Sequence, residues 1–310
     1  MSRRARDISA ALIVAPWGVW AIVRVLGLDR VYPVVPGVAF TPWAAVASFA
    51  AVGVALLLRS WAAAAVAAAA ALALVIVIAP RVTADDQPNA RGEIITLMSV
   101  NMLAGRADAR EIVELVRGRD VDILSLQELT PEAVAALRRA GLERTLAHGL
   151  DESRYAVAGA GLWSRERLRR GAPTDPRWWS APEGVIEKLK LRVRAVHPRP
   201  PISPEAEPVW RANIAAMPTA DPKDSELRII AGDFNATLDH RVLRRLIDRG
   251  YTDAAEAAGK GLIRTWPSSG WPSLTIDHVL VDRRIAVRGF DVFTVSGSDH
   301  RALIARLQLP

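Results

Sequence analysis

The chain has 310 residues with 40 basic and 33 acidic side chains, a formal net charge of +7, and no cysteine. The lack of cysteine excludes disulfides, thiolate nucleophiles and zinc–thiolate sites. Six arginines and two aspartates lie in residues 1–80, so these carry +4 and residues 81–310 carry only +3. The polar part is nearly balanced, without the basic block that tracks a nucleic-acid backbone.

Three long apolar stretches occupy residues 8–28, 31–58 and 60–80. A helix of about 21 residues rises about 31 Å, which matches the ~30 Å hydrocarbon layer of a bilayer. The first stretch carries one charge, Arg24, and the prolines of the second delay its helix until after Pro36 or Pro42. We expect residues 1–80 to be a membrane anchor of three transmembrane helices rather than a cleaved signal peptide.

Arginines predict the orientation of this anchor. The segment "RRAR" at the N-terminus favours the cytoplasm, and Arg59 marks the second cytoplasmic turn. Three crossings then place residues 81–310 outside the cytoplasmic membrane, which makes the chain a multi-pass protein of the cell membrane. Residues 81–92 are polar and contain proline, so we expect a linker there and a catalytic domain over residues 93–310.

The pattern after the linker predicts one α/β domain. "EIITLMSVN" reads as a buried strand that ends at Asn101, and Asp108 begins a helix with apolar side chains at helical spacing. "VDILSLQE" is a second strand, ending at Glu128, and the next helix begins at Thr130 and ends at Gly141. Further strands are expected within residues 187–197, 226–235, 275–282 and 302–307.

Polar side chains recur at the ends of these apolar strands. Carboxylates are seldom buried without partners, and a divalent-metal site needs several of them at one edge. The side chains in question are Asn101, Glu128, His197, Asp233 with Asn235, Asp277 with His278, and Asp299 with His300.

These residues stand in motifs that resemble the endonuclease/exonuclease/phosphatase superfamily, the deoxyribonuclease-I-like fold. The motifs are "SVNML", "SLQEL", "GLWSR", "AVHPRPP", "AGDFNAT", "TIDHVLV" and "GSDHRAL", and they cover essentially all of residues 93–309. The resemblance implies an α/β (α+β) fold, a four-layer αββα sandwich of two mostly antiparallel sheets. It also implies a Mg²⁺ or Mn²⁺ site at one end of the sandwich.

The resemblance assigns metal binding to three residues. Magnesium prefers hard oxygen ligands and usually takes one or two carboxylates together with phosphate and water. Glu128 is the first expected ligand and Asp299 the second, and the amide of Asn101 orients the ligand shell. The metal would polarise a phosphoryl oxygen and screen charge in the transition state.

Five further residues are expected to be catalytic. His300 is the acid–base candidate, and Asp277 would fix its tautomer. Asp233 and Asn235 would position the attacking water and the phosphate, and His197 would contact phosphate or protonate the leaving oxygen. The superfamily assigns the base sometimes to the histidine and sometimes to the aspartate, so His300 and Asp233 both remain candidates.

Other polar and aromatic side chains are expected outside the catalytic set. His278 should face away from the polar residues at the strand ends and be structural, and His148 and His240 are expected at the surface. Arg211 is expected on an outer helix, and Tyr155 lies in too loose a context for assignment. The Pro/Gly-containing loop "DPRWWSAPEG" carries Trp178 and Trp179, of which one is expected to pack at a core edge. The alternative is an interfacial anchor or a substrate wall.

Three functions are compatible with these features. The first is a membrane-anchored, metal-dependent phosphoesterase or pyrophosphatase acting on a lipid-linked or small phosphate outside the membrane. The second is an extracytoplasmic nuclease acting on DNA or RNA, which the low charge and the absence of an acid at Leu103 disfavour. The third is an inactive domain that binds phosphate or a partner. The complete set of acids and imidazoles argues against it, so the sequence favours a hydrolase.

Overall fold

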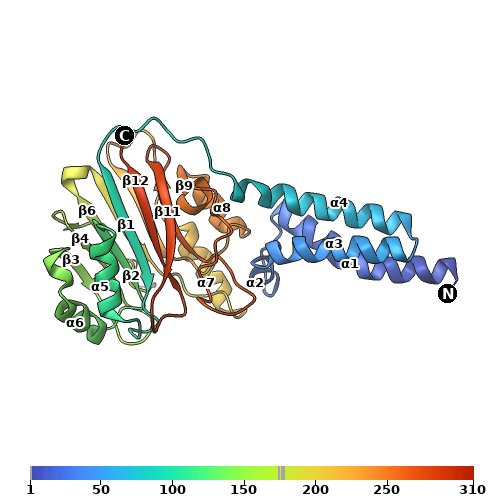
Figure 1. Cartoon of the computed structure of the whole chain (residues 1–310), viewed down its shortest axis with the longest axis horizontal. Helices are drawn as coiled ribbons and strands as arrows, with labels where there is room; N and C mark the ends of the chain where they lie inside the picture. Colours follow the sequence, from blue (N-terminus) through green and yellow to red (C-terminus); the bar gives the residue numbers. More distant parts are fainter. Residues whose placement is uncertain (1, 174, 176–178) are drawn as a thin grey trace.

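A helical bundle and an α/β domain make up the chain in a computed structural model, which describes residues 2–173, 175 and 179–310. The N-terminus lies at the end of the bundle that is far from the domain (Figure 1). The long helices of the bundle lie side by side, so α1 and α4 end near the domain and α3 begins there. The elements are α1 (Arg3–Leu26), α2 (Val34–Val38), α3 (Thr41–Leu57), α4 (Trp61–Ile78) and the 3₁₀ turn η1 (Ala79–Val82).

Small residues form the contacts between the long helices of the bundle. Ala10 of α1, Ala55 of α3 and Ala67 of α4 are fully buried and belong to one cluster. Side chains as small as alanine let helix backbones approach closely, as in membrane helix bundles. Many larger apolar side chains point outward instead; Leu12 is 71% exposed and Leu72 is 60% exposed. The bundle is therefore apolar on its outside as well as inside.

Two of the three expected membrane spans are long and apolar enough to cross a bilayer. These are Arg3–Leu26 and Trp61–Val82, whereas Thr41–Leu57 is a shorter apolar helix of 17 residues. The stretch 31–58 does not form one helix because its prolines interrupt it: a separate short helix, α2, comes first, and Pro42 lies in the first turn of α3. At 1.5 Å per residue, α3 is only about 26 Å long. Three transmembrane helices are thus not confirmed.

Within its described residues, the α/β domain contains two six-stranded sheets. Most neighbouring strands are antiparallel, and the β1–β2 and β7–β8 pairs are parallel. The first sheet has the order β11 (Ala286–Thr294), β12 (Arg301–Gln308), β1 (Ile94–Asn101), β2 (Ile123–Gln127), β4 (Ala160–Ser164) and β3 (His148–Glu152). The second has the order β5 (Arg169–Arg170), β6 (Glu183–Ile186), β7 (Leu191–Val196), β8 (Leu227–Asp233), β10 (Asp277–Asp282) and β9 (Tyr251–Asp253).

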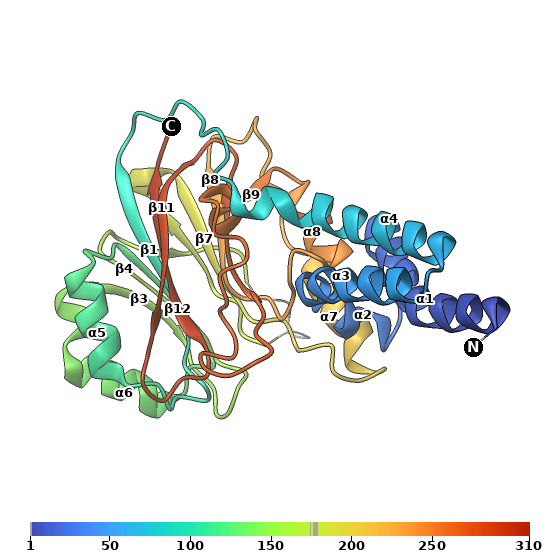
Figure 2. The ribbon, with the colours of Figure 1, turned by 45° about the vertical axis from the view of Figure 1, so that its right-hand side comes forward.

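The sheets pack face to face with helices outside them (Figures 1 and 2). Alternation along β1 shows why: Leu97 joins the core between the sheets, and Met98 joins the cluster under α5 and α6. Along β8, Ile229 faces the other sheet and Ile230 faces α7 and α8. The helical elements are α5 (Ala109–Gly118), α6 (Pro131–Ala140), η2 (Leu142–Arg144), η3 (Glu187–Leu189), α7 (Ala206–Ala215), α8 (Arg241–Ile247) and α9 (Ala254–Ala257).

The predicted starts of α5 and α6 and the predicted end of α6 are confirmed. The Asp108 side chain accepts hydrogen bonds from two backbone N–H groups in the first turn of α5, and Thr130 caps α6 in the same way. Gly141 ends α6 in the left-handed conformation, with φ of 90°. The segment 81–92 is hydrogen-bonded to the domain, for instance through Gly92 to Leu309. Its role as a boundary between two domains stays a prediction.

A buried ion cluster joins the bundle to the domain. Asp239 is fully buried; it accepts hydrogen bonds from Arg81 at 2.8 and 2.6 Å and pairs with Arg24 of α1. Burial opposes the charged form of Asp239, but the two guanidinium groups outweigh burial and hold its pKa below the usual range. His240, which the sequence placed at the surface, is buried instead because its Nε2 lies 3.0 Å from the carbonyl oxygen of Val35 in α2.

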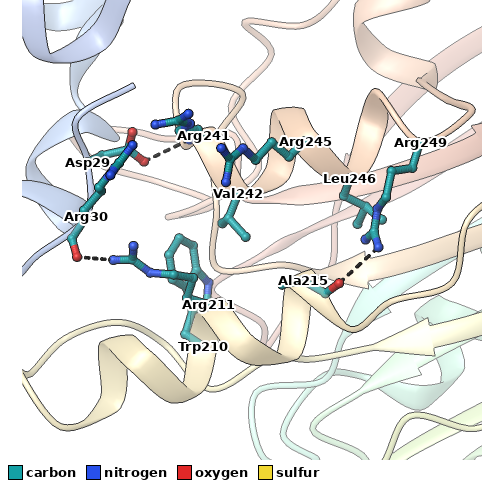
Figure 3. A pocket seen from close by; sticks show the side chains of 10 residues that line it. All are labelled: Asp29, Arg30, Trp210, Arg211, Ala215, Arg241, Val242, Arg245, Leu246 and Arg249. Atoms are coloured by element: carbon teal, nitrogen blue, oxygen red, sulfur yellow. Dashed lines mark hydrogen bonds between the residues drawn. The ribbon is translucent and has the colours of Figure 1, made fainter. Parts of the chain in front are cut away.

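Arginines of the domain continue this junction beside the end of α1. Figure 3 shows the backbone N–H of Arg241 donating to Asp29 at 2.9 Å, and Arg211 donating to the carbonyl oxygen of Arg30. Val35 packs into the apolar cluster beneath α7 and α8. Because polar and apolar contacts both connect the two parts, the bundle is held in one position on the domain.

Asp239→Asn should destabilise the full-length protein by about 3 kcal/mol, because it leaves two buried guanidinium groups without their counter-charge. Thermal unfolding in detergent measures the effect. Asp248→Asn is the matched control, since Asp248 is an exposed aspartate at the end of α8. Equal unfolding midpoints for the two variants would show that the cluster does not stabilise the junction.

Candidate active site

Strand pairing brings the predicted polar residues to one end of the sandwich. Asn101 ends β1 and Glu128 follows β2, its parallel neighbour, so both lie at the same edge. Asp233 ends β8 and lies directly opposite Asp277, which begins the antiparallel strand β10. His300 immediately precedes β12, which pairs antiparallel with β1. The contacts described below join the two sheets at this edge.

Asn101 connects the acidic side chains of the two sheets. Its Nδ2 donates to Glu128 Oε1 at 3.1 Å and to Asp233 Oδ2 at 3.2 Å, and the residue is fully buried. Its Oδ1 accepts a hydrogen bond from the backbone N–H of Leu103 at 2.9 Å, which fixes the orientation of the amide. Asn101 therefore holds two carboxylates close together in a buried position.

The turn after β1 supplies a contact that sequence reasoning missed. Leu103, Ala104 and Gly105 all have positive φ, between 46° and 77°. In this conformation the backbone N–H of Ala104 donates to Glu128 Oε2 at 2.8 Å. Two consecutive residues other than glycine in the left-handed region are uncommon and occur often at functional sites. No side-chain signal marks this contact, because a backbone group makes it.

His300 and Asp277 form the acid–imidazole pair that the sequence predicted. His300 Nδ1 lies 3.1 and 3.0 Å from the two carboxylate oxygens of Asp277, and the backbone N–H of His300 donates to Ser298 Oγ. Burial by itself would lower the pKa of His300, but Asp277 and then Asp233 outweigh burial and raise it to about 10. The ring is therefore an imidazolium at neutral pH, with Nε2 3.7 Å from Asp233 Oδ2.

His197 faces the same carboxylates in the opposite protonation state. Burial, followed by the positive charge of His300, lowers the pKa of His197 to about 4. Its Nδ1 lies 3.2 Å from the carbonyl oxygen of Val157, and its Nε2 lies 3.5 Å from Asp233 Oδ2. In the neutral ring, donation from Nδ1 to Val157 leaves Nε2 as an acceptor. Trp179 packs on this imidazole with ring centroids 4.8 Å apart.

Asp233 contacts Asn101 and lies within 4 Å of both imidazoles of the cluster. Its Oδ1 accepts the backbone N–H of Asn235 at 2.8 Å, and the Asn235 side chain donates to the carbonyl oxygen of Pro198. Burial, followed by repulsion from Asp277, raises the pKa of Asp233 above its usual range. Burial likewise raises the pKa of Glu128. These carboxylates bind protons more readily than exposed ones do.

The donor set fits a divalent cation. Asp299 Oδ2 accepts from Trp266 Nε1 at 3.0 Å, whereas Asp299 Oδ1 is shielded from solvent without a hydrogen-bond partner among the described residues. The nearest described cationic group to this oxygen is His300 Nε2 at 3.9 Å, too far for a hydrogen bond, so the oxygen is open to a metal ion or a water molecule. Asp233, Asp277 and His300 also offer one ligand atom each within 4.8 Å of one another. Both Asp277 oxygens already contact His300, whereas Asp299 Oδ1 accepts no hydrogen bond from a described residue, so Asp299 offers the freer oxygen.

These groups line a pocket of about 490 Å³. Glu128, Asp233 and His300 form its polar end, and Trp179 and Trp266 contribute aromatic walls. Three residues of the N-terminal bundle, Pro36, Ala39 and Phe40, complete the wall. Sequence reasoning missed this contribution because the two segments meet only in the tertiary structure.

The remaining expectations concern residues outside the predicted catalytic set. His278 is buried against Asp253, with 2.7 Å between Nδ1 and Oδ2, and His148 is exposed, so both predictions are confirmed. Arg211 lies on α7 as expected, and Tyr155 is 78% exposed. Trp179 packs at the pocket edge, whereas Trp178 lies outside the described residues.

The chain was compared with known families and solved structures. A profile of the Endonuclease/Exonuclease/phosphatase family matches residues 98–300, which is more than half of the chain and includes every predicted site residue from Asn101 to His300. The chain belongs to the Endonuclease/Exonuclease/phosphatase family. Phosphatases and nucleases of this family hydrolyse phosphate esters, so the chain is assigned to the hydrolases. No curated protein matches the chain.

Solved structures of the Endonuclease/Exonuclease/phosphatase family share the fold. A family member from Beutenbergia cavernae has a TM-score of 0.53 and 16% identity, over 70% of this chain and 72% of that one. Humanized D. rerio TDP2 has a TM-score of 0.54 and 16% identity, over 69% and 99%. The Neisseria 3′ phosphatase NExo, bound to a product DNA hairpin, has a TM-score of 0.51 and 18% identity, over 68% and 98%. At these identities the likeness is one of fold.

The two histidines of the family site should titrate far apart in the metal-free protein. NMR of ¹⁵N-labelled histidine should show His300 still protonated above neutral pH and His197 neutral down to acidic pH. Asp277→Asn should move the His300 pKa downward, because the main carboxylate that raises it is gone. An ordinary His300 titration near neutral pH in the unaltered protein would contradict the imidazolium assignment.

Proposed function

We propose that this chain is a membrane-anchored, divalent-metal-dependent phosphoesterase that hydrolyses a phosphate ester or pyrophosphate, including a lipid-linked one, outside the cytoplasmic membrane. One observation carries the proposal: Glu128, Asp233 and His300 line one pocket, and Asn101 donates hydrogen bonds to both carboxylates. The transfer of a phosphoryl group to water needs oxygen ligands for a metal, a carboxylate that takes up a proton, and a positive charge such as an imidazolium.

The metal would be held by Glu128 and Asp299, with Asn101 fixing the position of Glu128. Mg²⁺ or Mn²⁺ suits this oxygen-rich set, and when bound it neutralises charge that develops on the phosphoryl oxygens. Glu128 is already oriented by two hydrogen bonds, from Asn101 and from the backbone of Ala104. Such support lowers the cost of ordering a ligand when the ion enters.

The acid–base roles follow from the hydrogen bonds of each group. Asp233 takes the proton of the attacking water, because burial and the neighbouring Asp277 make it a stronger base than an ordinary carboxylate. The water oxygen bonds to phosphorus as the bond to the leaving oxygen breaks. His300 Nε2 donates to a phosphoryl oxygen, while Asp277 holds the other side of the ring. His197 Nε2 accepts from the water and orients it, and the Asn235 amide helps to hold the phosphate.

The apolar bundle supports a location in the cell membrane. The α3 helix of 17 residues reaches the lower limit of about 17 to 25 residues for a membrane helix, so we propose that it crosses together with α1 and α4. Arg3, Arg4, Arg6 and Arg59 belong to the end of the bundle that is far from the domain. Arginines favour the cytoplasmic side. The catalytic domain would then lie outside.

Hydrolysis assays of the full-length protein distinguish the candidate activities. Phosphate release from alkyl phosphates and pyrophosphates in detergent is compared with cleavage of plasmid DNA. We expect phosphate release with Mg²⁺ or Mn²⁺ and none after chelation. Cleavage of DNA without phosphate release would indicate a nuclease. Metal binding without either reaction would indicate a binding domain.

Glu128→Gln and His300→Ala should each lower kcat by at least about 10²-fold, because each removes a group that acts on the transition state. Phosphate release at saturating metal measures the effect. His148→Ala serves as the control, since His148 is exposed and lies outside the pocket. Near-normal turnover in either site variant would remove that residue from the catalytic set.

A single cysteine can test the topology, because the chain has none of its own. A membrane-impermeant thiol reagent should label Asp86→Cys in intact cells, since this exposed residue would lie outside the membrane. Asp7→Cys, near the N-terminus, should react only after lysis. The opposite pattern for the two sites would reverse the orientation.

A further inference from the structure

A second cavity lies beside the catalytic pocket, between the helical bundle and the α/β domain. Its volume is about 520 Å³. The two cavities share the lining residues Ala39 and Leu274, so they are immediate neighbours. Among the residues that form its walls are Pro42, Val46 and Phe49 of α3, Val75 and Ile78 of α4, and Leu262 of the domain.

The chemistry of this second cavity is that of a hydrocarbon site. Apolar side chains make most of its wall, and its charged residues, Arg81 and Asp239, are bound to each other by two hydrogen bonds. A polar ligand would find few groups left to pair with, whereas an alkyl chain gains about 0.8 kcal/mol for each buried CH₂ group. The catalytic pocket next to it carries the acids and imidazoles instead.

The second cavity also borders the apolar outer surface of the bundle. Val46 is 69% exposed and Phe49 is 59% exposed, and both lie in the first half of α3, the half nearer the domain. Side chains of this size and exposure on an apolar helix suit contact with lipid. A chain that leaves a bilayer beside α3 would enter this cavity before it reached Ala39 and the catalytic pocket.

We infer that the second cavity is a tail pocket, which holds the hydrocarbon chain of an amphiphilic substrate while its phosphate group lies at Glu128, Asp233 and His300. The inference deepens the proposed function and rests on it, because it assigns the substrate class to phosphate or pyrophosphate esters of long-chain alcohols. The membrane bundle then has a second role besides anchoring: it forms one wall of the substrate site.

Chain-length selectivity tests the tail pocket. For the full-length protein in detergent, kcat/KM is measured for the hexadecyl and butyl esters of phosphate and pyrophosphate. Val46→Trp fills the pocket from an exposed position, and Ala39→Phe narrows its boundary with the catalytic pocket. Each should lower the hexadecyl-to-butyl ratio by at least about tenfold, because several methylene contacts are lost. Val66→Trp, an exposed valine of α4 far from both cavities, should leave the ratio and the rates unchanged.

The outcomes separate the tail pocket from the proposed function. If both esters are hydrolysed and neither pocket variant changes the ratio, the tail pocket is wrong and the phosphoesterase stands. If no ester is hydrolysed, photolabelling with a hexadecyl phosphate that carries a diazirine in its chain still decides the matter. If the reagent labels residues 39–49 and Val46→Trp abolishes this labelling, the tail pocket is supported even without catalysis. Label elsewhere, or unaltered in that variant, overturns it.

Discussion

Mutual repulsion among buried acids is the constraint on which the catalytic end depends. Glu128, Asp233 and Asp277 are all buried around one point, where each negative charge raises the cost of the next. Asn101 relieves part of this cost by donating to two of them, and the His300 imidazolium relieves another part. The residual negative charge is what prepares the site for a cation and a proton. The same excess of negative charge therefore lowers the stability of this end of the domain and enables its chemistry.

The opposite protonation states of the two imidazoles arise from their partners. His300 contacts a carboxylate through Nδ1, so the charged ring is favoured despite burial. His197 is buried and lies near the charge of His300, and these two effects outweigh its Nδ1 contact with a carbonyl oxygen, so its neutral ring is favoured. Two residues of one type thus differ in charge, one a cation and the other a neutral hydrogen-bond acceptor, and the proposed mechanism uses this difference. Environment rather than residue type makes this distinction.

The junction between bundle and domain connects the position of the helices with the shape of the pocket. Asp239 fixes α1 and η1 on the domain, and Val35 and His240 fix α2. Since the following residues, Ala39 and Phe40, line the pocket, the position of the bundle determines the shape of the site. The α/β domain without the bundle would lack this wall.

Residues whose roles are local were predicted from the sequence. Apolar patterns predicted the strands, and Asp108 and Thr130 predicted the helix starts. The polar residues at the strand ends predicted the candidate site. These features depend on neighbours a few residues apart, and the ordered motifs added the family. The expectation of three transmembrane helices is not confirmed, because the prolines before Thr41 shorten the middle helix.

Contacts between distant segments were decided only by the tertiary structure. The burial of His240, the Ala104 backbone donor and the pocket wall from Ala39 each join segments that no local pattern relates. The direction of each pKa shift could also be determined only from the tertiary structure, because it depends on which charges become neighbours after burial. The sequence by itself determined which chemical groups this protein has and at which strand ends they lie. The tertiary structure decided which of them share a charge, a proton or a wall, because those interactions act through space rather than along the chain.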